Sequence, residues 1–244
     1  MRQVARIGPI LAAVSAAASS SALGPRLILT SAGLTTPELR SSFQHMLAEA
    51  SAGASSPSVS MLVTAAMAPS SDSSTSKRSA GELRRRRWAD ARKKGRAVQA
   101  ELSSLMSSPV MVDCIDCVRD DAARLQESIG QASCVWITGG NTFFLWHHMQ
   151  RSGAAALIEQ RVNDGGLFVG QSAGAIVAGE SIATAYWKGW DDPQAAPEAV
   201  WNSESLGTTH NSHVSGASKS CAAANVQRKQ TMGELLENAS YLSM

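Results

Sequence analysis

Residues 167–178 read LFVGQSAGAIVA, and this stretch predicts a buried strand, a sharp turn and a helix in direct succession. Leu167, Phe168 and Val169 form a continuous apolar run, which is typical of a strand buried on both faces of a parallel sheet. The small residues around Ser172 allow the backbone to make a strained turn, and the residues after it are compatible with a helix. A serine on such a turn lies at a helix N-terminus, where developing negative charge is favoured.

The position of Ser172 makes its hydroxyl a candidate nucleophile. A serine hydroxyl attacks only when it is held in position and a base takes its proton. The pattern G-x-S-x-G occurs by chance, but here an apolar run precedes it and a helix-compatible run follows. We therefore interpret Ser172 as catalytic, and the alternative is a glycine-rich turn with an idle serine.

A second glycine turn occurs at residues 135–145, which read VWITGGNTFFL. The ends of adjacent strands in a doubly wound sheet meet at one edge, where ligands bind. We therefore expect the backbone N–H groups of Gly140 and Ala173 to form an oxyanion hole. Asn141 and Thr142, which begin the following helix, are candidate substrate-binding residues. The alternative is a plain turn in which Asn141 caps the helix.

Strand-like and helix-like segments alternate along the chain. The apolar runs lie at residues 27–29, 61–63, 110–112, 135–137 and 167–169. The segments with helical character lie at residues 37–50, 120–129 and 154–162. This alternation predicts an α/β fold, a doubly wound and mostly parallel sheet with helices on both faces.

A base for the serine must come from one of the histidines, which are His45, His147, His148, His210 and His213. His210 and His213 lie in a segment rich in Ser, Gly and Asn, and loops at strand ends commonly carry catalytic residues. His147 and His148 follow the second glycine turn by about two helical turns, which directs them away from the sheet edge. A carboxylate must orient the imidazole. The residues alone leave five acids open: Glu180, Asp191, Asp192, Glu198 and Glu204.

The positive charge of the chain is concentrated in one segment. Ten of the 22 Lys and Arg residues lie between residues 77 and 96, so the rest of the chain is mildly acidic. A nucleic-acid-binding protein of uniformly basic character is excluded by this pattern, and we expect no nucleic-acid partner.

The chain is predicted to contain a leader at 1–24 and one α/β domain over 25–244, with a Ser-rich loop and a basic helix at 68–105. We interpret the basic run at 82–105 as a solvated helix, and contact with an anionic partner is the alternative.

The N-terminal composition bears on targeting, and the cysteine spacing bears on metal binding. Residues 1–24 are rich in Ala and Ser and contain Arg but no acid, which fits a transit or signal peptide or a disordered leader. We therefore expect a cytoplasmic or organellar protein, and no apolar run is long enough to span a membrane.

Cys114 and Cys117 form a C-x-x-C that follows an apolar run. We interpret them as thiols at a strand end, and expect no metal and no cofactor.

Together the two glycine motifs resemble those of the aspartyl dipeptidase (peptidase E) family of serine peptidases, which also includes the cyanophycinases. The matching segments are GGNTFFL at 139–145 and GQSAGA at 170–175, and LILTSAGLTTPELR at 27–40 is similar to the family's first strand and loop. The resemblance implies a class I glutamine amidotransferase-like, flavodoxin-like fold. Family members usually continue into further strands, so we expect this chain to lack the C-terminal strands.

The resemblance assigns roles to individual residues. Ser172 matches the nucleophile, His213 matches the base, and the acid falls at Asp191 or, in the alternative register, at Asp192. It implies hydrolysis of short peptides, dipeptides with an N-terminal aspartate, through a Ser-His-Asp triad and an acyl-enzyme. The alternatives are a cyanophycinase-like activity on β-linked Asp–Arg polymer and a truncated, non-catalytic family member. The expected partner is a small peptide substrate, and the oligomeric state is left open.

Overall fold

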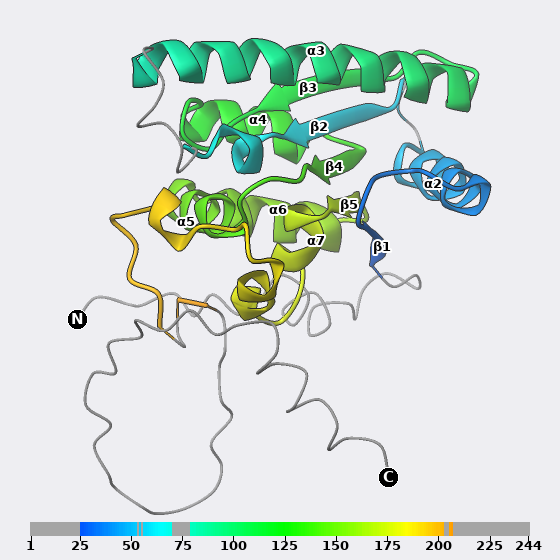
Figure 1. Ribbon diagram of the computed structural model, residues 1–244. Coiled ribbons are helices and arrows are strands. Elements are labelled where there is room, and N and C mark those ends of the chain that lie inside the picture. Colours follow the sequence, from blue (N-terminus) through cyan, green and yellow to red (C-terminus); the bar gives the residue numbers. More distant parts are fainter. Residues whose placement is uncertain (1–24, 53, 55, 70–78, 203–204, 207–244) are drawn as a thin grey trace, which may run out of the picture. The chain divides into compact units, whose positions relative to one another are not determined.

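A parallel β-sheet runs through the structure, which is a computed structural model (Figure 1). It describes residues 25–52, 54, 56–69, 79–202 and 205–206, all within residues 1–209. Five strands follow the order β1-β5-β4-β2-β3, and every neighbouring pair is parallel. The strands are β1 (Arg26–Thr30), β2 (Ser58–Leu62), β3 (Met111–Ile115), β4 (Cys134–Ile137) and β5 (Leu167–Gln171). Each overlaps one of the five predicted apolar runs.

The burial of each strand follows from its place in the sheet. β4 is buried at all four positions, and β5 and β2 each have four buried residues out of five. β1 and β3 lie at the edges, where Leu29 is 47% exposed and Met111 is 58% exposed. The continuous apolar runs are therefore matched by burial on both faces in the three inner strands.

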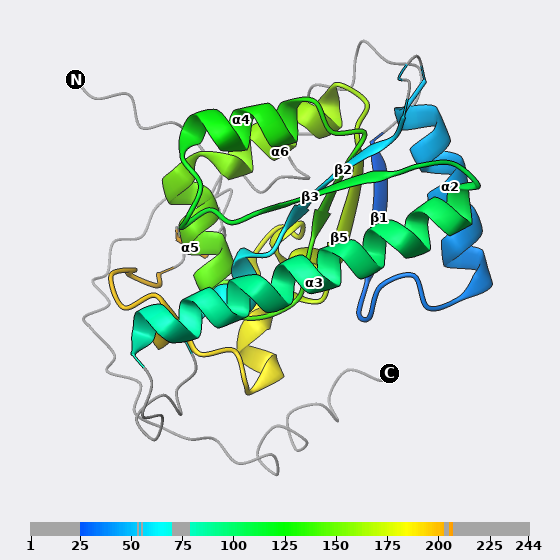
Figure 2. The ribbon, with the colours of Figure 1, turned by 90° about the horizontal axis from the view of Figure 1, so that it is seen from above.

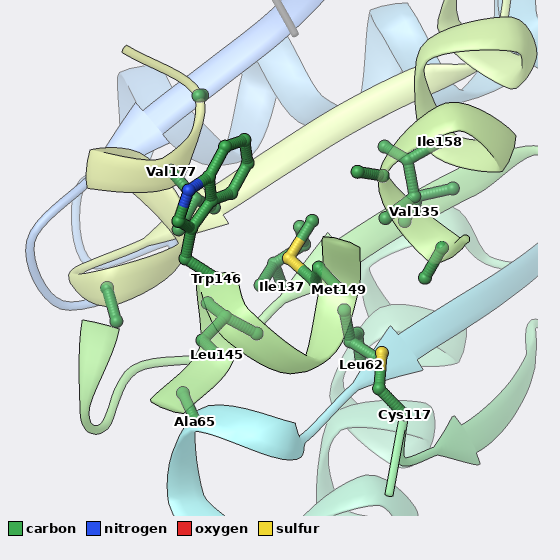
Figure 3. Packing of buried hydrophobic residues seen from close by; sticks show 14 of the residues in the cluster. Leu62, Ala65, Cys117, Val135, Ile137, Leu145, Trp146, Met149, Ile158 and Val177 are labelled. Atoms are coloured by element: carbon green, nitrogen blue, oxygen red, sulfur yellow. The ribbon is translucent and has the colours of Figure 1, made fainter. Parts of the chain in front are cut away.

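Helices cover both faces of the sheet (Figures 1 and 2). α2 and α3 pack on one face, where Phe43, Leu47 and Leu102 join a buried cluster with β2 and β4 residues. α4, α5, α6 and α7 pack on the other, around a second cluster of which Figure 3 shows Leu145 and Met149 of α5 with Ile137 of β4. The helices are α2 (Pro37–Ala50), α3 (Ala80–Met106), α4 (Ala122–Gly130), α5 (Thr142–Ser152), α6 (Ala154–Asn163) and α7 (Ala173–Val177), with the short 3₁₀ helices η1 (Thr64–Met67), η3 (Ile182–Lys188) and η4 (Pro193–Ala195). The predicted doubly wound α/β architecture is confirmed.

Side-chain caps explain where several helices begin. The Thr36 side chain accepts a hydrogen bond from Leu39 N, and α2 occupies the predicted range 37–50. The Asp121 side chain accepts from Arg124 N in the same way, so α4 begins at Ala122, two residues later than predicted. Short polar residues favour this cap position because their oxygens satisfy N–H groups that the first helical turn leaves open.

The basic segment forms α3, but its interpretation as a solvated helix is correct for only one side. Ala91, Gly95 and Leu102 are buried against the sheet. A Cβ atom on Gly95 would lie 2.3 Å from Cys114 Sγ, so the absent side chain lets α3 approach β3 closely. The Arg84 guanidinium also pairs with buried Asp116 at 3.1 Å. α3 is therefore a structural layer of the fold as well as a carrier of positive charge.

Several expectations lie outside the described residues: the leader at 1–24, most of the Ser-rich loop, and the expected lack of the family's C-terminal strands, which concerns residues 207–244. Within the part of the chain that is described, no helix combines the length and the apolar character needed to cross a bilayer.

Candidate active site

Ser172 lies at the turn between β5 and α7 and has a strained backbone. Its φ of 51° and ψ of −107° fall in a region that residues other than glycine rarely adopt. The turn is held by a 2.8 Å hydrogen bond from Ser172 N to Thr30 O, and the serine carbonyl accepts from Ala175 and Ile176 of α7. The side chain is half-buried, so it remains accessible at the sheet edge. Strain of this kind persists only where the surrounding structure imposes it, and it accumulates at functional sites.

Glycines on either side of the serine allow this turn to pack. A Cβ atom on Gly170 would lie 2.6 Å from Gly174 O, and one on Gly174 would lie 2.3 Å from Ile137 O. Neither separation is compatible with a larger residue without movement of the backbone. The small residues of the motif are therefore required by the contacts among β5, α7 and β4.

The second glycine turn lies beside the first, as the sequence predicts. β4 and β5 are parallel neighbours, and a Cβ atom on Gly139 would lie 3.1 Å from Ser172 Cβ. Gly140 has a φ of 146°, and a Cβ atom there would lie 2.2 Å from Ala65 O. Asn141 N donates to the same Ala65 carbonyl at 3.0 Å. The two predicted oxyanion-hole positions, Gly140 and Ala173, thus belong to adjoining turns.

Asn141 and Thr142 make contacts within the protein. Asn141 caps α5, since its Oδ1 accepts from Phe144 N at 2.8 Å, and its Nδ2 donates to Asp192 O at 2.9 Å. Thr142 is fully buried, and its N and Oγ1 both donate to Asp191 Oδ2. These side chains fix the loop at residues 191–192 against α5, and their role in substrate binding stays a prediction.

The two candidate acids occupy different environments. The Asp191 side chain is 1% exposed, and its Oδ2 forms an ion pair of 2.8 Å with Lys188 Nζ in addition to the bonds from Thr142. The Asp192 carboxylate instead caps η4, where Oδ1 accepts from Gln194 N at 2.9 Å. Asp191 is thus a buried, oriented carboxylate, whereas Asp192 has a local structural use.

Not all candidate bases can be placed. His210 and His213 lie outside the described residues, as does Glu204 among the acids. His45 is exposed on α2, with its Nε2 3.4 Å from Glu49 Oε1. His147 and His148 lie on α5. Both are close to Glu198, which belongs to the segment that follows η4.

A cavity adjoins the serine turn and was not predicted. It has a volume of about 480 Å³, and its lining includes Gly139 and Gln171 from the two turns. Arg87, Asp90 and Lys94 of α3 contribute charged groups to the same cavity. Local sequence signals gave no reason to connect a basic helix with a glycine turn some fifty residues later, because only the folded sheet brings them together.

A strained serine between a parallel strand and a helix, beside a charged cavity on a doubly wound sheet, is the arrangement that α/β hydrolases use to hold a nucleophile. Comparison with known families narrows this class. The model of peptidase family S51 matches residues 89–242, which is more than half of the chain. The chain belongs to this peptidase family, and its similarity to proteins named peptidase E confirms the family suggested by the glycine motifs.

The similar proteins are bacterial peptidases. An uncharacterized peptidase of Listeria monocytogenes is 33% identical over 86 residues, 35% of this chain and 42% of that protein. A peptidase E of a Shewanella species is 45% identical over 58 residues, 24% of this chain and 25% of that protein. A crystal structure of a candidate peptidase E from Listeria monocytogenes has a TM-score of 0.45 at 23% identity and covers 76% of each chain. The chain spans about half the length, or less, of the relatives matched by sequence.

Proposed function

We propose that the chain is a serine peptidase whose nucleophile is Ser172. The observation that carries the proposal is the strained backbone of Ser172, φ 51°, in contact range of the Gly139 turn. A non-glycine residue held in this conformation at a strand-to-helix turn presents its hydroxyl at the sheet edge. Membership of a peptidase family supplies the reaction class, which is hydrolysis of a peptide bond.

In the proposed mechanism, His213 takes the hydroxyl proton while Ser172 Oγ attacks the peptide carbonyl. The N–H groups of Gly140 and Ala173 stabilise the resulting oxyanion. The imidazolium then gives its proton to the leaving amine, and water releases the acyl group by the reverse sequence. The adjoining positions of the two turns support this assignment of the oxyanion hole.

Asp191 is the proposed acid of the triad. All its contacts with the described residues, from Thr142 and Lys188, fall on Oδ2. Oδ1 is therefore left for a further donor, as an imidazole N–H would require. Asp192 fits the role less well because its Oδ1 already caps η4. The Lys188 ion pair also keeps the Asp191 carboxylate in one orientation, which is what a triad acid contributes.

The proposed substrates are short peptides with an N-terminal aspartate. The cavity beside the serine turn carries Lys94 and Arg87, which attract a substrate carboxylate, and Asp90, which attracts an α-amino group. Arg87 also donates to the Ala68 carbonyl, so its guanidinium is held at the cavity wall. The charges of the cavity thus complement both ionised groups of an N-terminal aspartate, in keeping with the specificity implied by the peptidase E resemblance.

Hydrolysis of Asp-Leu by the full chain tests the proposal. Wild type is expected to release leucine, and Ser172→Ala is expected to lower kcat by about 10³-fold or more, as loss of a nucleophile does. Ser41→Ala, an equivalent change on the exposed side of α2, serves as the matched control. Equal activity of Ser172→Ala and wild type would overturn the mechanism. A parallel assay with a β-linked Asp–Arg dipeptide distinguishes the cyanophycinase-like alternative.

A further inference from the structure

Three side chains with metal-binding groups meet at α5. His147 and His148 come from the helix itself, and Glu198 comes from the segment after η4. One ligand atom from each residue lies within 4.8 Å of those of the other two. The imidazole rings of His147 and His148 are 4.9 Å apart, centroid to centroid, and nearly perpendicular at 77°.

The Nε2 atom of His147 has an unusual environment. It is buried and has no hydrogen-bond partner among the described residues, although Glu198 Oε1 lies only 3.1 Å away. The two atoms are close enough for an ion pair when His147 is protonated, but their angle lies outside ordinary hydrogen-bond geometry. A buried nitrogen whose nearest acceptor is poorly aligned gains little from that contact, so the position is open to a better ligand arrangement.

A shared metal ion would explain this arrangement. Two ligands of one tetrahedral zinc ion, with bonds of 2.0–2.1 Å, stand about 3.3 Å apart and direct their lone pairs at the ion rather than at each other. The 3.1 Å separation of His147 Nε2 from Glu198 Oε1 is close to that value. Two imidazoles and one carboxylate form a known zinc ligand set that leaves a fourth position for water.

The surroundings leave space for an ion. A cavity of about 560 Å³ is lined by His148 and Glu198, with Asp120 adding negative charge. His147 is not part of that lining, and it approaches the cavity only through its contact with Glu198. Arg151 is the opposing group, since its Nη1 lies 3.8 Å from Glu198 Oε1. Its side chain is 69% exposed, so solvent screens its charge.

We propose that His147, His148 and Glu198 form a binding site for a divalent zinc-class metal ion. The ion would tie the segment after η4 to α5. The same segment follows Asp191 and Asp192, and α5 begins at Thr142, which holds Asp191. Metal binding would therefore stabilise the packing of this segment. The site does not depend on the catalytic role of Ser172 or Asp191.

Zinc titration of the metal-free full chain, in competition with a fluorescent chelator, tests the site. Wild type is expected to bind one zinc ion here, and His147→Gln, His148→Gln and Glu198→Gln are each expected to weaken binding by at least ~10-fold. The matched control is His45→Gln with Glu49→Gln, which alters an exposed His–Glu pair on α2. A His210→Gln/His213→Gln variant, which tests histidines outside the described residues, is expected to keep the zinc.

A second measurement separates loss of the site from loss of the fold. Without metal, Glu198→Gln is expected to have the far-UV circular dichroism of wild type. Zinc is expected to raise the Tm of wild type but not that of Glu198→Gln, because an ion stabilises only the state that binds it. Zinc affinity or a zinc-dependent Tm shift that is unchanged in all three site variants would overturn the proposal, as would a wild type that binds no zinc.

Discussion

Gly139 and Ser172 belong to different strand ends and yet face each other: a Cβ atom on Gly139 would lie 3.1 Å from Ser172 Cβ and 3.5 Å from its Oγ. The contact arises because β4 and β5 are parallel neighbours whose carboxyl ends reach the same edge of the sheet. It connects the two glycine motifs physically, and a side chain larger than hydrogen at residue 139 would press on Ser172 Cβ.

Gly139→Ala is expected to impair catalysis more than folding. The added methyl group would lie 3.1 Å from Ser172 Cβ, so the serine side chain must shift by a few tenths of an ångström. Because a reacting group must be held closely in position, we expect kcat/KM to fall by about 10-fold. The measurement is kcat/KM for Asp-Leu together with Tm. Gly81→Ala is the control, since a Cβ atom there meets only Arg85 Nη1 at 3.9 Å. Full activity of Gly139→Ala would show that the contact does not constrain the nucleophile.

Asp191→Asn and Asp192→Asn separate the two candidate acids. Asp191→Asn removes the ion pair with Lys188 and is expected to lower kcat by about 10³-fold or more. Asp192→Asn is expected to stay close to wild type in both activity and stability, because asparagine caps helices as well as aspartate does. Steady-state kinetics of both variants provide the measurement.

Folding of the Asp191 variant needs its own control, because removing one partner of a buried ion pair destabilises a protein by about 3–5 kcal/mol. The double variant Lys188→Met/Asp191→Asn removes both charges, so it is expected to recover stability in urea unfolding without recovering activity. If activity returns with stability, Asp191 acts only as a structural residue.

Lys94→Gln is expected to raise KM for Asp-Leu while leaving kcat near that of wild type. Lys94 lines the cavity beside Gly139, and its loss removes attraction for the substrate carboxylate in both ground state and transition state. Lys93→Gln changes the neighbouring exposed lysine of α3, which is not part of that lining. An equal effect of the two substitutions would assign the change to the general charge of α3.

Cys117 is expected to resist alkylation in the native protein. Burial raises the pKa of its thiol to about 11. At pH 8 only about one thiol in a thousand is then ionised, and the thiolate is the reactive form. Iodoacetamide labelling followed by peptide mass spectrometry is expected to modify Cys117 slowly at pH 8, faster as pH approaches 11, and rapidly in urea. Rapid native labelling at pH 8 would support a reactive C-x-x-C.

Local signals in the sequence predict most of the fold. The Thr36 cap and Pro37 locate the start of α2, and the apolar runs locate all five described strands. These features depend on residues that are close in the chain. The motif around Ser172 likewise predicts its turn, because a strand, a small residue and a helix must follow one another there.

The adjacency of the two glycine turns was predicted from the rule that parallel strand ends meet, but other features formed by distant residues were missed. The Asp191–Lys188 ion pair is local, but its burial depends on Thr142, and no sequence pattern links that residue to the loop. The contact between His147 and Glu198 joins residues about fifty positions apart. No short metal-binding motif in the sequence links them, so the contact could not be predicted. Such sites become visible only when the topology of the sheet places separate segments together.

Labelling with a fluorophosphonate probe tests the central claim, that Ser172 is an activated nucleophile, whatever the substrate is. Intact-mass and peptide mass spectrometry of the full chain are predicted to show one adduct, located on Ser172 and absent from Ser172→Ala. Ser41→Ala should label like wild type. An unlabelled wild type, or an adduct on another serine that persists in Ser172→Ala, would contradict the account.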